Sequence, residues 1–233
     1  MSEKVDQNIE RLFTAGTHYG YSRTRRHPSM KNHVLTTKNG TDIINVEHTQ
    51  EQLEAAKTFL TEVSAKGGTI LFVGTKPEAR AIVERVAGST GMPFVIERWI
   101  GGTFTNWTEI KRRINKLAEL QGKKERGELD VYTKKERLLI DQEIAKLSKF
   151  FGGLSGLIKM PEAVVVVDPK HEEIAIKESQ LLSIPVIALA NTDCNIRGIA
   201  YPIVGNDASR SAITYIIEEL EKAMASGIIT TSA

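Results

Sequence analysis

The sequence predicts an α/β protein with a doubly wound, flavodoxin-like five-stranded parallel sheet and an inserted antiparallel helical (coiled-coil) hairpin. Short apolar runs rich in β-branched residues alternate with longer stretches of helical periodicity. Uninterrupted apolar runs are typical of strands that are covered on both faces, as in a parallel sheet. One segment, 105–155, breaks the alternation because it contains helical periodicity alone.

Five apolar runs are expected to form the strands of this sheet. Strands that alternate with helices form right-handed strand–helix–strand units, and successive units build a parallel sheet. We therefore expect the five runs to lie side by side in roughly flavodoxin-like order. The runs are 42–46, 69–73, 93–96, 163–167 and 185–189.

Polar residues with the spacing of helix caps mark where the helices should begin. A Ser or Thr followed three residues later by Glu or Gln satisfies two free backbone amides of the first turn. An Asp before a helical stretch can do the same from its own side chain. The predicted caps are Thr49 with Gln52, Thr75 with Glu78, Thr133 with Glu136, Asp168 and Asp207.

The segment 105–155 predicts a helical hairpin between the third and fourth strands. Two apolar stripes with spacings of three and four residues flank a polar stretch, GKKERGELD, that cannot form a core. At 1.5 Å per residue, such a hairpin would project up to about 30 Å. The stripes are Trp107, Ile110, Ile114 and Leu117, then Ile140, Ile144, Leu147 and Phe151.

These elements define the expected domain organisation. A discontinuous sheet domain, with an N-terminal helix and a basic loop, covers 1–104 and 156–227. The hairpin at 105–155 is inserted into it, and 228–233 are expected to form a flexible tail.

Composition excludes several classes of protein. The chain of 233 residues has a formal net charge of +2 and a single cysteine, Cys194, which cannot form an internal disulfide and fits a reducing compartment. No apolar run approaches the roughly 20 residues of a membrane helix. The first ten residues carry acids and no apolar core, unlike a secretory signal. We expect a cytoplasmic protein that does not interact with membranes.

The sheet raises the alternative of a nucleotide-dependent enzyme. In ILFVGTKPEAR, the residues Gly74, Thr75 and Lys76 follow a strand and could hold a phosphate, or could form an ordinary turn and helix cap. Neither G-x-x-x-x-G-K-[ST] nor G-x-G-x-x-G occurs in the chain. Cys194 has no activating neighbour in the sequence, and the histidines lack metal-ligand spacing. The residues therefore favour a protein that is not an enzyme and has no cofactor or small-molecule substrate.

Local charge favours RNA as the partner. Between Arg11 and Thr41 there is no acid, and YSRTRRHPSMKNH reads as an exposed basic loop beside Tyr19 and Tyr21. Guanidinium groups match phosphate oxygens, and tyrosines can stack on unpaired bases. The alternative is a basic loop that is merely solvated. A second basic stretch, RWIGGTFTNWTEIKRR at 98–113, favours a protein that binds RNA by one face, with its acids gathered in the C-terminal helices.

Several long motifs resemble one known family. They are LFTAGTHYG at 12–20, NGTDIINVEHT at 39–49, GMPFVIERWIGGTFTN at 91–106, the segment 161–192, and YPIVGNDASRS at 201–211. Over about residues 8–225 the chain is similar to bacterial small-subunit ribosomal protein two. This resemblance implies a doubly wound sheet with a protruding helical hairpin, and a structural role in the small ribosomal subunit.

The resemblance also implies partners and contact residues. It implies binding to small-subunit rRNA near the junction of head and body, support of assembly and translation, contacts with neighbouring small-subunit proteins, and in many bacteria anchoring of ribosomal protein one. Phosphate contacts would position the protein on folded RNA with little reading of bases. The candidate contacts are Arg23, Arg25, Arg26, His27 and Lys31 in the loop, and Arg98, Asn106, Lys111 and Arg112 at the base of the hairpin.

The chain departs from the family where some relatives hold a zinc ion. His18 and Asp207 are present, but Asn191 and Ala208 stand where carboxylates are usual, and Tyr21 replaces a second histidine. A structural zinc ion is bound by four ligands, which are thiolate, imidazole or carboxylate groups. We therefore predict no metal site.

Overall fold

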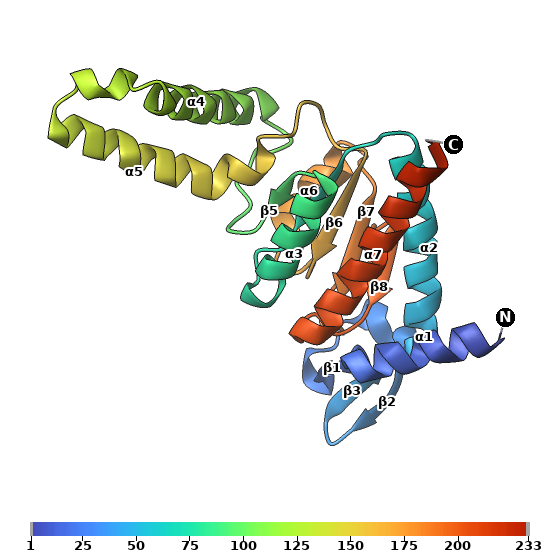
Figure 1. Cartoon of the computed structure of the whole chain (residues 1–233). Coiled ribbons are helices and arrows are strands. Elements are labelled where there is room, and N and C mark those ends of the chain that lie inside the picture. The colour runs from blue at the N-terminus through green and yellow to red at the C-terminus, as the bar shows by residue number, and fades with distance from the viewer. Residues whose placement is uncertain (1, 232–233) are drawn as a thin grey trace.

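A five-stranded parallel sheet forms the centre of the protein, as the sequence predicts (Figure 1). The computed structural model describes the backbone of residues 2–231 and the side chains of residues 7–227. Numbered along the chain, the parallel strands lie in the order 2-1-3-4-5, which is flavodoxin-like. Across the sheet they are β5 (Phe94–Val95), β4 (Ile70–Val73), β6 (Ala163–Val167), β7 (Val186–Ala190) and β8 (Tyr201–Val204).

Helices cover both faces of this sheet, which explains the uninterrupted apolar runs. In β4, Ile70 and Phe72 point into one core, whereas Leu71 and Val73 point into the other. The first core is closed by α2 (Val46–Ala65), α3 (Pro77–Thr90) and α7 (Arg210–Thr231). The second is closed by α6 (Glu173–Leu181) and by the parts of α4 (Trp107–Glu125) and α5 (Lys134–Phe151) that join the body.

One predicted strand belongs to a different sheet. The run 42–46 yields β3 (Thr41–Ile44), which pairs antiparallel with β1 (Tyr19–Ser22) and β2 (Val34–Lys38). Its positions alternate between half-buried and fully buried, so only one face is covered. The fifth parallel strand is instead β8, which the sequence analysis missed. Pro202 argues against a central strand, but β8 is an edge strand, where proline is tolerated.

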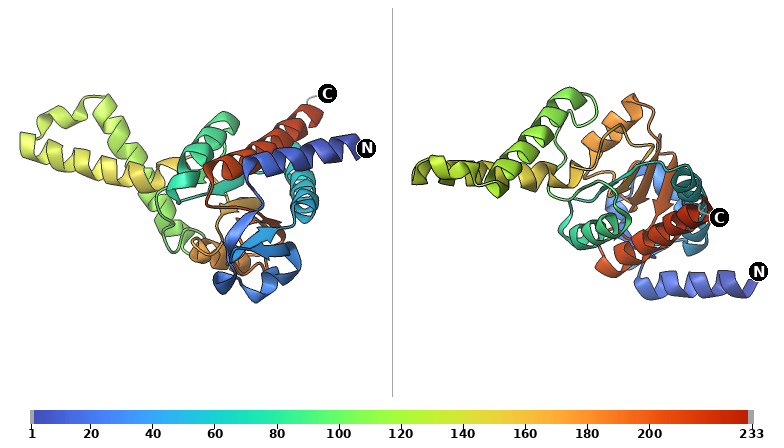
Figure 2. Two further views of the ribbon diagram at one scale, coloured as in Figure 1. Left: turned by 90° about the horizontal axis from the view of Figure 1, so that it is seen from below. Right: turned by 45° about the horizontal axis from the view of Figure 1, so that its top comes forward.

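The helical hairpin lies between β5 and β6 and projects from the body (Figures 1 and 2). The seam is buried at Ile114 and Leu147 and half-buried at Ile140, whereas Leu138 and Leu139, which are not part of the predicted stripe, are 57% and 56% exposed. The helices are joined through η3 (Glu128–Val131). On α5, the burial of the seam thus decreases from Phe151 at the base of the hairpin to Ile140 nearer the tip.

A glycine allows the hairpin to rejoin the body. After α5 the chain enters η4 (Gly152–Leu154) directly over β5. A Cβ at Gly153 would lie 2.3 Å from the carbonyl oxygen of Phe94, which no side chain tolerates. The close approach therefore requires glycine.

The predicted caps have mixed outcomes. Thr133 and Glu136 form the expected capping box of α5. Thr49 and Gln52 do not cap α2, because α2 already begins at Val46 with Asn45 as its cap. The Thr49 hydroxyl donates to the carbonyl of Val204 at 2.6 Å and the Gln52 Oε1 accepts from its N–H at 2.8 Å, so this pair joins α2 to β8.

The two ends of the chain are helical where the structure describes them. The N-terminal helix α1 (Ser2–Ala15) lies against α2 and α7. Helix α7 continues to Thr231, into the segment predicted as a flexible tail, and residues 232–233 lie outside the described residues. Within the described part of the chain, no helix combines the length and apolar character needed to cross a bilayer.

Candidate nucleic-acid interface

The crevice where doubly wound proteins usually bind ligands is filled by the chain's own side chains. The strand order reverses between β4 and β6, and ligands of such sheets bind beyond the carboxyl ends of the strands at this point. Here the Glu172 carboxylate accepts from the Thr75 N–H at 3.1 Å and from the Thr75 hydroxyl. Glu172 is only 3% exposed, and burial raises its pKa. The Glu172 carboxylate therefore already binds the Thr75 backbone amide, which would otherwise be free to hold a phosphate.

Lys76 also fills this crevice, where it binds two aspartates. Its Nζ lies 2.7 Å from Asp168 Oδ2 and 2.9 Å from Asp207 Oδ2. Burial acts to lower the pKa of Lys76, but the hydrogen bonds and charges of the two aspartates outweigh it and raise the pKa above 10.5. Thr75 and Glu78 do not form the predicted cap, since α3 starts at Pro77 with Lys76 as its N-cap residue and no side-chain cap. Thr75 is bound to Glu172 instead.

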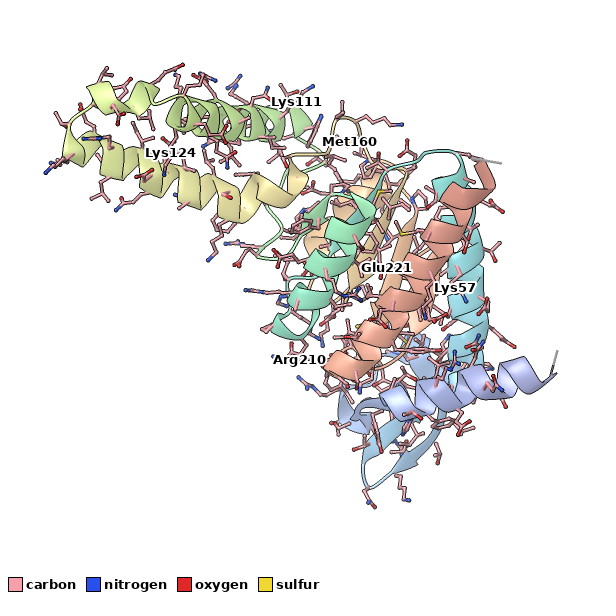
Figure 3. All side chains as sticks on the ribbon, viewed as in Figure 1. Lys57, Lys111, Lys124, Met160, Arg210 and Glu221 are labelled. Atoms are coloured by element: carbon pink, nitrogen blue, oxygen red, sulfur yellow. The ribbon has the colours of Figure 1, made fainter. Side chains whose placement is uncertain are left out.

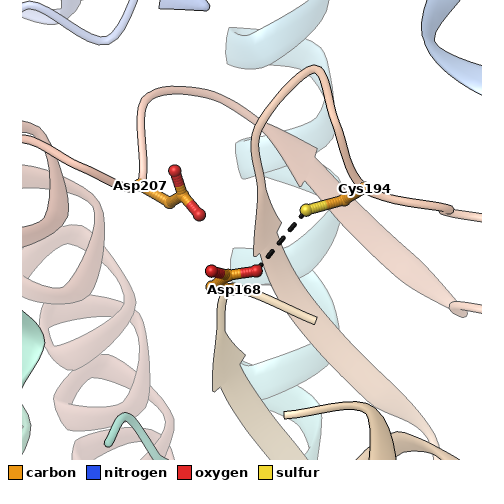
Figure 4. A group of neighbouring side chains, drawn as sticks. All are labelled: Asp168, Cys194 and Asp207. Carbon is orange, nitrogen blue, oxygen red and sulfur yellow. Dashed lines mark hydrogen bonds between the residues drawn. The ribbon is translucent and has the colours of Figure 1, made fainter. Parts of the chain in front are cut away.

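The same carboxylates form a group with Cys194 that resembles a metal site (Figure 4). One ligand atom from each of Asp168, Cys194 and Asp207 lies within 4.8 Å of the others. The residues do not fit a metal ion, because the Lys76 ammonium already binds both carboxylates. Burial and the surrounding carboxylates also raise the pKa of Cys194, which keeps it a thiol rather than the thiolate that binds metals.

The basic loop (residues 21–33) is attached to the carboxyl edge of the parallel sheet. It contains η1 (Arg23–Arg25) and η2 (Pro28–His33). The His27 N–H donates to the Thr192 carbonyl at 2.8 Å, and the Tyr21 N–H donates to the Thr192 hydroxyl oxygen at 2.9 Å. Met30 is fully buried in a small cluster with Ile44 and Val204. The sequence analysis missed this anchor because a single methionine in a polar stretch has no periodicity.

The structure separates the loop cations into exposed and anchoring residues. Arg23, Arg25 and Lys31 are exposed and form no ion pair with the side chains that the structure describes. The Arg25 guanidinium lies 5.1 Å from the centre of the Tyr21 ring, a cation–π geometry. Arg26 differs, because its Nε lies 3.5 Å from the fully buried Asp42 carboxylate.

We expect Arg26→Met to lower the free energy of unfolding by roughly 1–3 kcal/mol, because the buried Asp42 carboxylate loses its counter-charge. Urea denaturation measures this change. The control is Arg23→Met, which removes an exposed cation and should stay within about 0.5 kcal/mol of the wild type. Equal effects of the two substitutions would contradict the anchoring role of Arg26.

The base of the hairpin is held by one buried carboxylate, Glu178 of α6. Its Oε1 accepts from the Gly102 N–H at 2.7 Å, and its Oε2 accepts from the Phe104 N–H at 2.8 Å and the Thr105 N–H at 3.3 Å. The indole N–H of Trp99 lies 3.4 Å from Oε1. Sequence reasoning missed Glu178 because it is distant in sequence and resembles the exposed acids of its helix.

The predicted contacts at the hairpin base are all exposed, and Lys111 lies at the end of α4 next to the body (Figure 3). Arg112 pairs with Glu109 at 3.0 Å but remains 75% exposed. Asn106 is the N-cap residue of α4 and makes no side-chain cap bond, which leaves its amide available. Several cations nearer the tip are instead paired with acids of the hairpin, as Lys124 is with Asp141 at 2.7 Å.

The two groups of candidate contacts lie on one side of the molecule. The left panel of Figure 2 places the basic loop and the start of α4 on the side of α6, with α1 and α7 on the opposite side. Figure 1 places the two groups at different heights, with the loop below the sheet and the start of α4 above. The groups therefore share a side but are not in contact.

A closed crevice and an exposed cationic side together define a structural α/β protein rather than a nucleotide-dependent enzyme. The family model described as Ribosomal protein S2 matches residues 12–227, nearly the whole chain. The chain therefore belongs to the ribosomal protein S2 family. It is a non-enzymatic structural protein of the small ribosomal subunit, where it is assembled with rRNA and other proteins in the cytoplasm.

Proposed function

We propose that this chain binds small-subunit rRNA through the basic loop and the base of the hairpin, and thereby supports assembly and translation. The main support is Arg25, which is exposed, held over the Tyr21 ring and without a carboxylate partner among the described side chains. The basic loop that carries it lies on the same side of the sheet as the start of α4 (Figure 2). Unpaired cations on one side suit a polyanion that is bound by that side only.

The proposed contacts act mainly on phosphates. In the loop they are Arg23, Arg25, Arg26, His27 and Lys31, and at the hairpin base they are Arg98, Asn106, Lys111 and Arg112. Arginine side chains donate two parallel hydrogen bonds to phosphate oxygens, which fixes orientation without reading sequence. Arg26 acts mainly by holding the loop, because its Nε is engaged by Asp42.

The sheet domain, 1–104 with 156–227, serves in this proposal as a rigid mount for the hairpin at 105–155. Neighbouring small-subunit proteins, with ribosomal protein one among them in bacteria that have it, are the other partners that we propose. The faces of α1 and α7 are available to them because they lie away from the proposed RNA-binding side (Figure 2).

We expect the double substitution Arg25→Glu/Arg112→Glu to weaken binding to small subunits that lack this chain by about tenfold or more at 0.1 M salt. The dependence of log K on log salt should also become shallower, by about one unit for each lost phosphate contact. Sedimentation of labelled protein with the subunits at several salt concentrations measures both quantities.

The matched control is Lys66→Glu/Lys222→Glu, which reverses two exposed cations on α7 and at the end of α2, on the other side of the sheet. It makes the same change in net charge and should bind nearly as well as the wild type. If both double variants bind equally, the proposed RNA-binding side is incorrect.

A further inference from the structure

A groove lies between the basic loop and α6, in the interval between the two groups of proposed contacts. It has a volume of about 370 Å³, and its lining includes His27 from the loop, Ile176 and Lys177 from α6, and Asn195 and Arg197 from the segment after β7. The segment is held against α6, because the Gln180 side chain donates to the Gly198 carbonyl at 3.1 Å. The groove is therefore formed by three separate parts of the chain.

The groove carries more positive than negative charge. Two of its cations are neutralised locally, since Lys170 pairs with Asp193 at 2.7 Å and Lys177 pairs with Glu173 at 2.6 Å. Arg197 is exposed and forms no ion pair with any side chain that the structure describes. One full positive charge in the groove thus lacks a counter-charge within the described protein.

The basic loop lines this groove with His27, two residues after the exposed Arg25. His27 holds Ser29 through Nδ1, and its Nε2 makes no hydrogen bond in the described part of the protein. The unpaired Arg197 guanidinium leaves this groove with a net positive charge, which favours the binding of an anion.

Helix α6 connects this groove to the base of the hairpin. Its nine residues span about 13 Å at 1.5 Å per residue. Lys170 precedes its first turn, and Glu178 in its second half binds the backbone of residues 102, 104 and 105. The interval between the two proposed contact groups is thus short and carries its own cations.

We propose that this groove binds the phosphodiester backbone of an rRNA strand that runs from the basic loop along α6 to the hairpin base, with Arg197 as a direct phosphate contact. The inference rests on the proposed function and adds residues that the sequence analysis did not select. Lys170 and Lys177 exchange part of their pairing with Asp193 and Glu173 for phosphate oxygens. Asn195 and His27 Nε2 supply uncharged hydrogen bonds beside them.

The test uses Arg197→Glu in the full chain, bound to small subunits that lack this protein. We expect binding to weaken about tenfold at 0.1 M salt and the salt dependence to become shallower by about one unit. Arg197→Lys keeps the charge and should restore most of the affinity. Because Arg197 is exposed and unpaired, neither substitution should change the urea midpoint, which checks that the fold is intact.

A photo-crosslinking side chain introduced at Asn195 provides a second measurement, and we expect it to crosslink to rRNA. Unchanged affinity of Arg197→Glu, or crosslinks to protein only, would overturn the assignment of the groove. The proposed function fails separately, if Arg25→Glu/Arg112→Glu binds as tightly as its control. The two results are therefore distinguishable.

Discussion

Substituting Lys76 by methionine is expected to lower the free energy of unfolding by about 3–5 kcal/mol at pH 7. Methionine retains much of the apolar stem but removes the ammonium that bridges Asp168 and Asp207. The Asp207 side chain is fully buried and that of Asp168 is 11% exposed. Two buried carboxylates without a counter-charge repel each other and lack solvation, so the folded state loses stability. Urea denaturation measures the loss.

The contribution of Asp168 to the pH dependence should have the opposite sign in this variant and in the wild type. Burial acts to raise the pKa of Asp168, but the hydrogen bond and charge of Lys76 outweigh it and hold the pKa below 3.8. A depressed pKa contributes stability above the unfolded value, and this contribution is lost as the pH falls through the folded value. The wild type should therefore lose this contribution only below about pH 4.

In the wild type, burial and the charge of Asp168 already raise the pKa of Asp207, and without Lys76 the pKa of Asp168 should rise above the unfolded value as well. Protonation then favours the folded state, so lowering the pH from 7 to 5 should raise the stability of the variant by about 1 kcal/mol. The control is Lys116→Met, which breaks an exposed pair with Glu143 and should change stability by about 0–1 kcal/mol. A Lys76→Met protein that loses stability between pH 7 and pH 5 would contradict this account.

Glu178→Ala is expected to destabilise the protein by about 2–4 kcal/mol, because it leaves the buried Phe104 N–H and the Gly102 N–H without their acceptor. The effect should be concentrated at the base of the hairpin. The two tryptophans, Trp99 and Trp107, both lie there, so their emission should shift to the red before the global unfolding transition. Fluorescence and circular dichroism recorded in the same urea titration would separate the two events.

The matched control is Glu173→Ala, on the same helix. Among the side chains that the structure describes, its carboxylate pairs with Lys177 alone, and both side chains are 65% exposed, so we expect a change of about 0–1 kcal/mol. Glu178→Gln keeps one acceptor oxygen and should fall between the alanine variant and the wild type. Coincident fluorescence and circular dichroism transitions at the wild-type midpoint would rule out the anchoring role of Glu178.

Local sequence predicted the elements whose signal is contained within a few residues. The strands from 69–73 to 185–189 are apolar runs bounded by turns, and each forms a strand of the parallel sheet. The Thr133–Glu136 capping box depends only on residues three apart in one helix. The hairpin follows from periodicity in the same way. Such features depend on residues that are close together in the chain, so the sequence is enough to predict them.

The errors concern residues whose partners are distant in sequence. Thr49 has the spacing of a capping residue but binds Val204, 155 residues away, and Thr75 binds Glu172. The run 42–46 resembles any other strand until the position of its sheet is known. A hydroxyl or a strand edge has several possible partners, and only packing selects among them.

The amino-acid sequence by itself determined the doubly wound sheet, the inserted hairpin and the family of this protein, because periodicity and long motifs are properties of the chain. Only the tertiary structure decided that Glu178 anchors the hairpin, that Arg26 neutralises Asp42, and that Lys76 closes the crevice. The reason is physical: the sequence names a charged residue but does not show whether its side chain is solvated or buried. Its role depends on which opposite charges and amide groups the folded chain brings within hydrogen-bonding distance.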